Sequence, residues 1–177
     1  MERSADTELR ELLERLHDTY NRPEFIPDDP ISVPHRFTDC ADREIAGFFA
    51  ATIAWGNRRT IVRNGHRMMR LMDDAPADFV RNASERELAG LDAFVHRTFR
   101  GCDLRDFVLA LRRIDSGWGG LGAFFEHSYA VTGDLAATLA DFRRAFFAGE
   151  HAPRCEKHLS SVERGATPGT SPARWGC

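Results

Sequence analysis

Apolar side chains recur at steps of three and four residues along most of the chain, and this spacing places them on one face of an α-helix. The first run predicts an amphipathic helix over residues 6–20 and consists of Leu9, Leu12, Leu13, Leu16 and Tyr20. Similar runs predict helices over about 41–55, 58–72, 103–115, 121–131 and 134–148. The two-residue alternation typical of strands is almost absent, so the pattern predicts an all-α fold.

These segments differ in how much of their circumference is apolar. The 41–55 segment is apolar on most sides, which predicts the central buried helix. The 58–72 segment has one apolar side and one arginine-rich side. Between the longer helices, Pro76 suits the first turn of a short helix through Val80, and Ser84 with Glu87 forms the capping box of another.

Proline and glycine interrupt this pattern twice. Four prolines between residues 21 and 35 predict an extended, stiff connector, because proline lacks an N–H and restricts its predecessor. Its apolar residues are expected to pack on the body; they are Phe25, Ile26, Ile31 and Val33. The run from Ser116 to Gly120 is expected to break the helix before it and to shape a turn.

The composition changes abruptly at Gly165, where the chain continues as GATPGTSPARWGC. Such a segment has no hydrophobic periodicity and cannot bury a core. We therefore expect an all-α domain over residues 1–164 and a disordered tail over 165–177. The tail is either natural or the product of an out-of-frame or truncated gene.

Overall charge gives no attraction to a polyanion, because the 177 residues carry a formal net charge of -3. Lys157 is the only lysine in the sequence, so arginine supplies nearly all of the positive charge. The guanidinium fork suits phosphate, although arginine usage can also reflect the base composition of a gene. We predict no membrane partner and a cytoplasmic location, since no apolar run approaches the roughly 18 residues of a span.

We predict neither a metal site nor a cofactor. The cysteines are far apart without a C-x-x-C pair, which indicates reduced structural thiols at Cys40, Cys102, Cys155 and Cys177. A helix could bring three metal ligands to one side, but no fourth ligand is apparent beside His151, Cys155 and His158. We likewise assign no catalytic residue, because no Ser-His-Asp or Cys-His order is present.

A candidate nucleic-acid interface begins at the break between the second and third helices. Asn57 could reach a base edge and Trp55 could stack, while Arg58 and Arg59 contact phosphates. The alternative is that Trp55 belongs to the core, Asn57 caps the next helix and the arginines are solvated.

Arg63, Arg67 and Arg70 continue the basic side of the 58–72 helix, without acids four residues away to pair with them. They are assigned to the same interface, although a charged helix face is more often simply solvated. His96 and Arg97 lie between aromatic residues and could grip a phosphate. A structural role for His96 is equally consistent with the sequence.

Four blocks of the chain resemble an uncharacterised bacterial family, the domain of unknown function 2400. They are YNRPEFIPDDPISVPHRF at 20–37, EIAGFFAATIAWGNRRTI at 44–61, DFVRN at 78–82 and FVHRTFRGCDL at 94–104. The resemblance covers residues 8–165 and implies that further family sequence, including a Lys-Arg helix, would follow the HLSSVERGA stretch. This chain therefore resembles an N-terminal portion with an aberrant end.

That family is in turn similar to the helix-hairpin-helix DNA glycosylases, whose early buried helix and DNA-facing loop match the 44–61 block. The resemblance implies the DNA-binding part of a repair protein that lacks its catalytic part and is inactive alone. The alternative is a non-catalytic helical module that contacts protein or RNA. A third possibility is an unstable product that exposes the side of its last helix carrying Phe142 and Phe146.

Overall fold

The computed structural model describes residues 5–162, and nearly all of its regular structure is helical. The α-helices are α1 (Ala5–Tyr20), α2 (Cys40–Thr52), α3 (Arg58–Leu71), α4 (Pro76–Asn82), α5 (Glu85–Gly90), α6 (Gly101–Trp118), α7 (Leu121–Thr132) and α8 (Leu135–Phe146). Short 3₁₀ helices are η1 (Pro23–Asp28), η2 (Pro30–Ser32), η3 (Pro34–Arg36), η4 (Leu91–Ala93) and η5 (Pro153–His158). One antiparallel hairpin joins β1 (Val95–His96) to β2 (Phe99–Arg100). The predicted all-α fold is confirmed.

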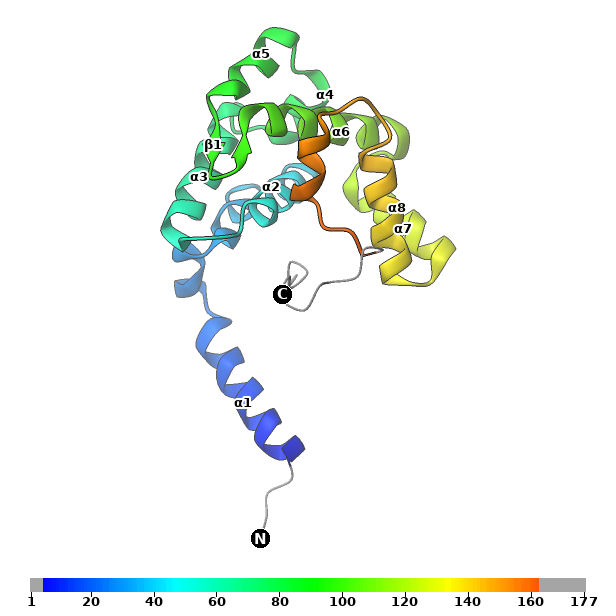
Figure 1. The fold of residues 1–177 in the computed structure, drawn as a ribbon. Coiled ribbons are helices and arrows are strands. Elements are labelled where there is room, and N and C mark those ends of the chain that lie inside the picture. The colour runs from blue at the N-terminus through cyan, green and yellow to red at the C-terminus, as the bar shows by residue number, and fades with distance from the viewer. Residues whose placement is uncertain (1–4, 163–177) are drawn as a thin grey trace.

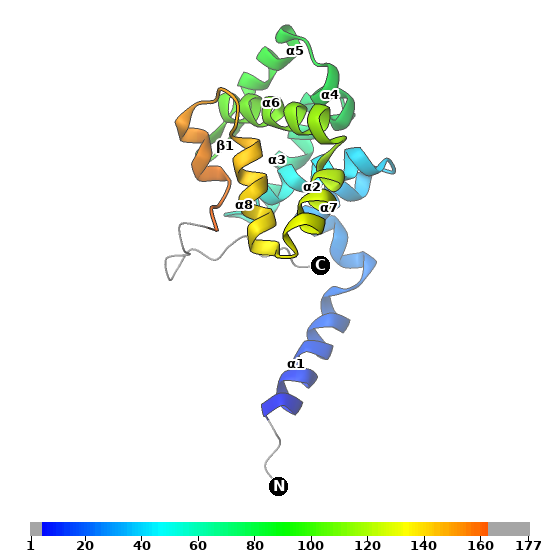
Figure 2. The same ribbon diagram turned by 90° about the vertical axis from the view of Figure 1, so that its right-hand side faces the viewer.

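Helices α2 and α6 form the centre of the body. Helix α2 packs against α3, α4 and α7, and α6 packs against α4, α7 and α8. Figure 1 shows α3 on one side of this pair and α7 with α8 on the other. The quarter turn in Figure 2 shows that α1 projects away from the body in both views.

Phenylalanine rings join the two central helices to α8. Phe48 of α2, Phe107 of α6 and Phe146 of α8 stack in pairs, with centroid separations from 4.9 to 6.0 Å. Burial of such rings is among the largest apolar contributions that single residues make to a core. The third possibility, in which Phe142 and Phe146 are exposed, is contradicted, because their side chains are only 4% and 0% exposed.

The four prolines predicted an extended connector after α1. The structure instead shows three short 3₁₀ helices there, η1, η2 and η3. Pro23, Pro30 and Pro34 each occupy the start of one of these helices. Proline suits this place because its fixed φ is helical and the first N–H of a helix needs no internal partner. The connector packs on the body mainly through Val33, which is 1% exposed, whereas Ile31 remains 43% exposed.

Two helix ends differ from the prediction. Helix α2 ends at Thr52 and leaves Trp55 in the following turn. Helix α6 continues through the expected break to Trp118, and within it the Ser116 hydroxyl donates to the Arg112 carbonyl at 2.8 Å. Gly119 then ends the helix with a φ of 85°, a left-handed conformation that suits glycine.

No helix within residues 5–162 is long and apolar enough to cross a membrane. The predicted tail over 165–177 lies outside the residues that the structure describes. The domain boundary at residue 164 therefore stays a prediction.

Two glycines of α6 are expected to respond oppositely to alanine. A Cβ on Gly101 would lie 2.4 Å from the Leu91 carbonyl oxygen and 2.4 Å from the Asp92 Cα, whereas a Cβ on Gly117 meets nothing within 4 Å. We expect Gly101→Ala to destabilise the fold by about 3 kcal/mol, as overpacking against backbone does. Gly117→Ala should stabilise it by about 0.5 kcal/mol, because alanine is the better helix former. Urea unfolding of both variants checks this, and equal stabilities would contradict the close approach of α6 to η4.

Candidate nucleic-acid interface

The turn between α2 and α3 is closed by its own side chains. Asn57 caps α3, since its Oδ1 accepts the Thr60 N–H at 3.2 Å. Gly56 takes a φ of 106°, which a residue with a Cβ would adopt only with strain. The Asn57 side-chain oxygen is thus engaged in the cap, which is the alternative role that the sequence suggested for this residue. The amide nitrogen has no partner among residues 5–162.

Trp55 lies half-buried between this turn and the β1–β2 hairpin. Its Nε1 donates to the Thr52 carbonyl at 3.2 Å, and its ring meets His96 edge to face at a centroid distance of 5.3 Å. The Arg97 guanidinium lies 5.1 Å from the indole centroid. This cation–π contact fixes Arg97 above the turn and leaves the indole little freedom to wedge between bases.

His96 holds the hairpin to the turn from within. Its ring is 1% exposed, and Nε2–H donates to the Trp55 carbonyl at 3.3 Å while Nδ1 accepts from the Asn64 amide at 2.9 Å. A carbonyl can only accept, so these two bonds select the neutral ring protonated on Nε2. His96 therefore positions Trp55 and Arg97 and presents no group to solvent.

Arg97 occupies an unusual backbone position in the two-residue hairpin loop. Its φ is 54°, which costs free energy for a residue with a side chain. The exposed guanidinium packs over Gly56, where even a Cβ would come within 2.9 Å of Nη1. Hairpin and turn together thus place one cation beside the start of α3.

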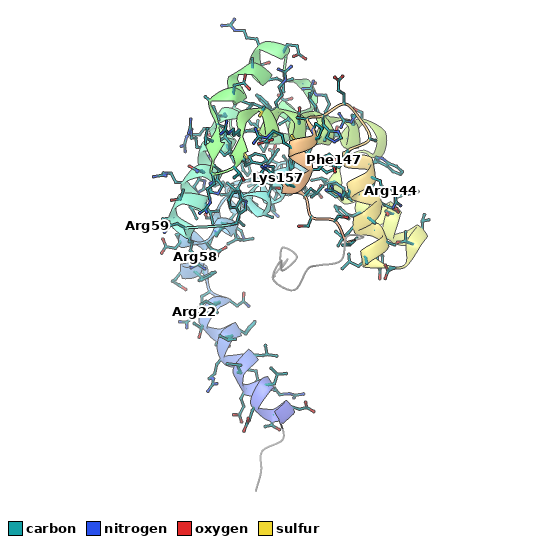
Figure 3. The ribbon with its side chains drawn as sticks, in the orientation of Figure 1. Arg22, Arg58, Arg59, Arg144, Phe147 and Lys157 are labelled. Atoms are coloured by element: carbon teal, nitrogen blue, oxygen red, sulfur yellow. The ribbon has the colours of Figure 1, made fainter. Side chains whose placement is uncertain are left out.

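The predicted arginines of α3 separate into two groups. Arg58 pairs with Asp29 at 3.2 Å and lies 4.9 Å from the Phe25 ring centroid, and Arg67 donates to the Ala93 carbonyl at 2.7 Å. Arg59, Arg63 and Arg70 are exposed and have no hydrogen bond or ion pair within residues 5–162. Figure 3 shows Arg58 and Arg59 at the outer side of the molecule, away from Arg144 and Lys157. We call Arg59, Arg63 and Arg70 the α3 basic face.

The end of the α3 basic face meets acids. Asp73 and Asp74 follow α3 with φ values of 56° and 52°, and Asp74 pairs with Arg36 at 2.9 Å. Close by, burial lowers the pKa of His66 below its usual value, and the charges of Arg36 and Arg70 lower it further against the opposing effect of Asp74. The positive field is consequently strongest toward the start of the helix, around Arg59 and Arg63.

A second cluster, which sequence reasoning missed, lies where η5 meets the start of α6. Asp103 is 0% exposed and accepts the Arg100 N–H at 2.8 Å and the Cys155 thiol at 3.2 Å. Arg154 compensates its charge at 3.2 Å. An acid in the first turn of a helix can cap the helix start, and Asp103 in the sequence RGCD could have been recognised as such an acid. The partners 51 and 52 residues farther on had no signal in the sequence.

The three candidate metal ligands do not all meet in this cluster. Cys155 contacts Asp103 and Asp106, and the His158 Nε2 lies 3.6 Å from Asp103, whereas His151 turns to Glu156 at 3.5 Å. Within residues 5–162 no three groups of the metal-binding kinds converge on one point. Burial, and next the bonds to Asp106 and Asp103, raise the pKa of the Cys155 thiol. It stays protonated as a hydrogen-bond donor and does not supply a thiolate nucleophile.

Three histidines give the fold a predictable pH dependence. Burial is the main cause that lowers the pKa of His66, His96 and His158. The unfolded chain, with a histidine pKa of about 6.5, then binds more protons than the folded chain, so stability rises with pH up to that value. We expect lower unfolding free energy at pH 5.5 than at pH 7.5 in urea titrations. The loss should shrink in His96→Gln and persist in the exposed-site control His127→Gln; equal stability at both pH values would contradict neutral buried rings.

Comparison with known proteins places most of the chain in one family. The family model described as "Protein of unknown function (DUF2400)" matches residues 29–169. No curated protein and no solved structure gives a significant match. The matched range includes α2, α3 and the β1–β2 hairpin, which together build the candidate interface.

Proposed function

The chain belongs to the DUF2400 family of proteins of unknown function, and from that premise we propose that its α3 basic face binds the phosphate backbone of DNA. The observation that carries this proposal is the exposure of Arg59, Arg63 and Arg70 on one helix without a partner in residues 5–162. Guanidinium groups grip phosphate oxygens through paired N–H donors. Arg97 adds a fourth cation beside the start of α3.

The start of α3 supports an anionic ligand for a separate reason. The first turn of a helix is positive because of the macrodipole, and acids usually occupy it. Helix α3 has no acid in its first turn and places Arg58 and Arg59 there instead. Arg58 is neutralised by Asp29, but Arg59 adds its charge to that of the helix end. A phosphate at this end would relieve both charges.

The net negative charge of the chain means that any attraction to DNA must come from a local patch. A net charge of -3 excludes attraction of DNA by the molecule as a whole, so binding depends on the few cations of one face. Such contacts position a duplex without reading its sequence. We therefore propose binding with little base preference.

Base excision is the finer part of the proposal and rests on the similarity to helix-hairpin-helix glycosylases. In such a role, the α3 basic face would hold phosphates beside a nucleotide that is taken out of the stack. A lyase step would further require an activated lysine. Lys157 lies in η5, and Figure 3 shows it near the middle of the view, apart from Arg59 at the left edge. We expect residues 1–177 to bind DNA without excising a base.

The salt dependence of DNA affinity tests the proposal. Anisotropy of a fluorescein-labelled duplex of random sequence would be titrated with the protein at several salt concentrations. Three or four phosphate contacts predict a slope of about -3 in log affinity against log salt, since each contact releases counterions. Undetectable binding, or affinity that does not change with salt, would overturn the proposal and favour a protein-binding module.

A further inference from the structure

Helix α1 exposes a row of large apolar side chains. Among residues 5–162, it meets the body at its end, where Tyr20 packs on Phe25 with ring centroids 5.3 Å apart, and the rest of the helix projects away from the body (Figures 1 and 2). The exposed fractions are 55% for Leu9, 43% for Leu12, 56% for Leu13, 41% for Leu16 and 52% for Tyr20. Their three- and four-residue spacing aligns them along one stripe.

An isolated helix of this length is only marginally stable in water, so α1 gains stability by covering the stripe. We infer that the stripe pairs with α1 of a second copy of this chain, and that the two helices run antiparallel. The charges beside the stripe select both this partner and this orientation.

Charges of both signs border the stripe. With 3.6 residues per turn, Glu8 and Arg15 fall along one edge, and Asp6, Arg10 and His17 fall along the other. All five side chains are exposed. On the first edge, the acid Glu8 is nearer the N-terminus and the base Arg15 is nearer the C-terminus.

A two-fold axis that relates antiparallel helices brings each edge against the same edge of its partner, running in the opposite direction. Glu8 of one copy then faces Arg15 of the other, and the reverse pair forms by symmetry. Two pairs of opposite charge thus line this edge of the apolar seam, as interhelical pairs do in coiled coils.

Parallel pairing would bring the two different edges together. Glu8 would then lie between Asp6 and Arg10 of the partner, and Arg15 would lie near His17 with no acid at its height. Antiparallel helices also oppose their macrodipoles, which parallel helices do not. Glu8 and Arg15 therefore pair with each other only in the antiparallel orientation.

The arrangement has a consequence for the dimer as a whole. Each α1 enters its own body at its C-terminal end, through Tyr20 and the connector. Antiparallel helices place the two bodies at opposite ends of a helix pair about 24 Å long. The dimer is therefore elongated, and each copy keeps its own α3 basic face.

Charge-reversal variants of the full chain test the inference by sedimentation equilibrium. Wild-type protein is expected to dimerise over the micromolar range. Glu8→Arg alone and Arg15→Glu alone should each raise the dimer dissociation constant about tenfold, because each homodimer sets like charges against each other at two places. An equal mixture of the two variants should regain the wild-type affinity, since both cross-pairs are then of opposite sign.

A matched control separates pairing from net charge. Glu14→Arg makes the same charge change as Glu8→Arg on the side of α1 away from the stripe and should leave dimerisation unchanged. Leu12→Asp should abolish the dimer without altering the urea unfolding of the body, because Leu12 does not contact the core. A wild-type monomer at all concentrations, or a mixture that stays as weak as its components, would overturn the inference.

Discussion

The double variant Arg59→Glu with Arg63→Glu is expected to lower DNA affinity about 100-fold. Both side chains are exposed, and neither has a hydrogen bond or ion pair within residues 5–162. Each contact of a guanidinium with phosphate contributes about 1.5 kcal/mol as a charge-assisted hydrogen bond, and two lost contacts give about a 100-fold change. The acids that replace them also repel the phosphates. Anisotropy titration of the labelled duplex at fixed low salt measures this effect.

The matched control carries the same change of net charge on other surfaces. Arg86→Glu with Arg144→Glu changes one arginine of α5 and one of α8, and Figure 3 shows Arg144 on a different side of the molecule from Arg59. Its affinity should fall less than threefold, through long-range repulsion alone. If both double variants lose affinity equally, binding is unspecific attraction and the α3 basic face is wrongly assigned. Urea unfolding of both variants shows whether the fold is intact; a small loss of stability is expected in the control, because Arg144 pairs with Asp141 at the surface.

Removal of the buried carboxylate is expected to cause a large loss of stability. Asp103→Ala leaves the Arg100 N–H without its acceptor at the start of α6. It also removes one acceptor each from the Arg154 guanidinium and the Cys155 thiol, which keep other acceptors. Loss of the cap and of the buried acceptor costs about 3 kcal/mol together, because the Arg100 N–H is left unsatisfied at the start of α6. Urea unfolding followed by circular dichroism should show this decrease.

Two variants distinguish the charge from the side chain itself. Asp92→Ala removes an exposed acid of η4 without a hydrogen bond or ion pair in the described part of the chain and should change stability by less than about 0.5 kcal/mol. Asp103→Asn keeps an acceptor oxygen but not the charge, so its stability should fall between those of the wild type and Asp103→Ala. Equal stability of Asp103→Ala and Asp92→Ala would show that the cluster contributes nothing to the fold.

Local signals predicted the parts of this fold that depend on local physics. The apolar and basic sides of residues 58–72 predicted both ends of α3 to within one residue. The N-terminal end was predictable because asparagine is a preferred N-cap, and Asn57 caps this helix. The capping box of Ser84 and Glu87 is present, and it starts α5. These features need only contacts between residues a few positions apart, which a sequence displays directly.

The predictions were wrong where one residue type is compatible with two backbone conformations. Prolines were interpreted as extended breakers, yet Pro23, Pro30 and Pro34 start 3₁₀ helices, since the same fixed φ suits both conformations. Glycine and serine were interpreted as a helix break at Ser116, although Gly117 continues α6. Packing of α6 against its neighbours outweighs the small cost of one helical glycine.

The candidate site was predictable as a basic face but not as an arrangement. The sequence indicated unpaired cations on this helix, because no acid lies four residues from Arg63. The partners that engage Arg58 and Arg67 are Asp29 and the Ala93 carbonyl, which lie 29 and 26 residues away in sequence. His96 likewise acquires its role only when the hairpin folds against Trp55, 41 residues earlier. Such pairings depend on the tertiary fold, which periodicity does not encode.

The location of bound DNA tests the central claim most directly. Ultraviolet cross-linking of the wild-type protein to a labelled duplex, followed by mass spectrometry of the attached peptides, maps the contact without any substitution. The account predicts attachment within residues 55–71 and at the 96–98 hairpin loop, around the α3 basic face. Attachment confined to α7 or α8, with α3 unlabelled, would contradict it.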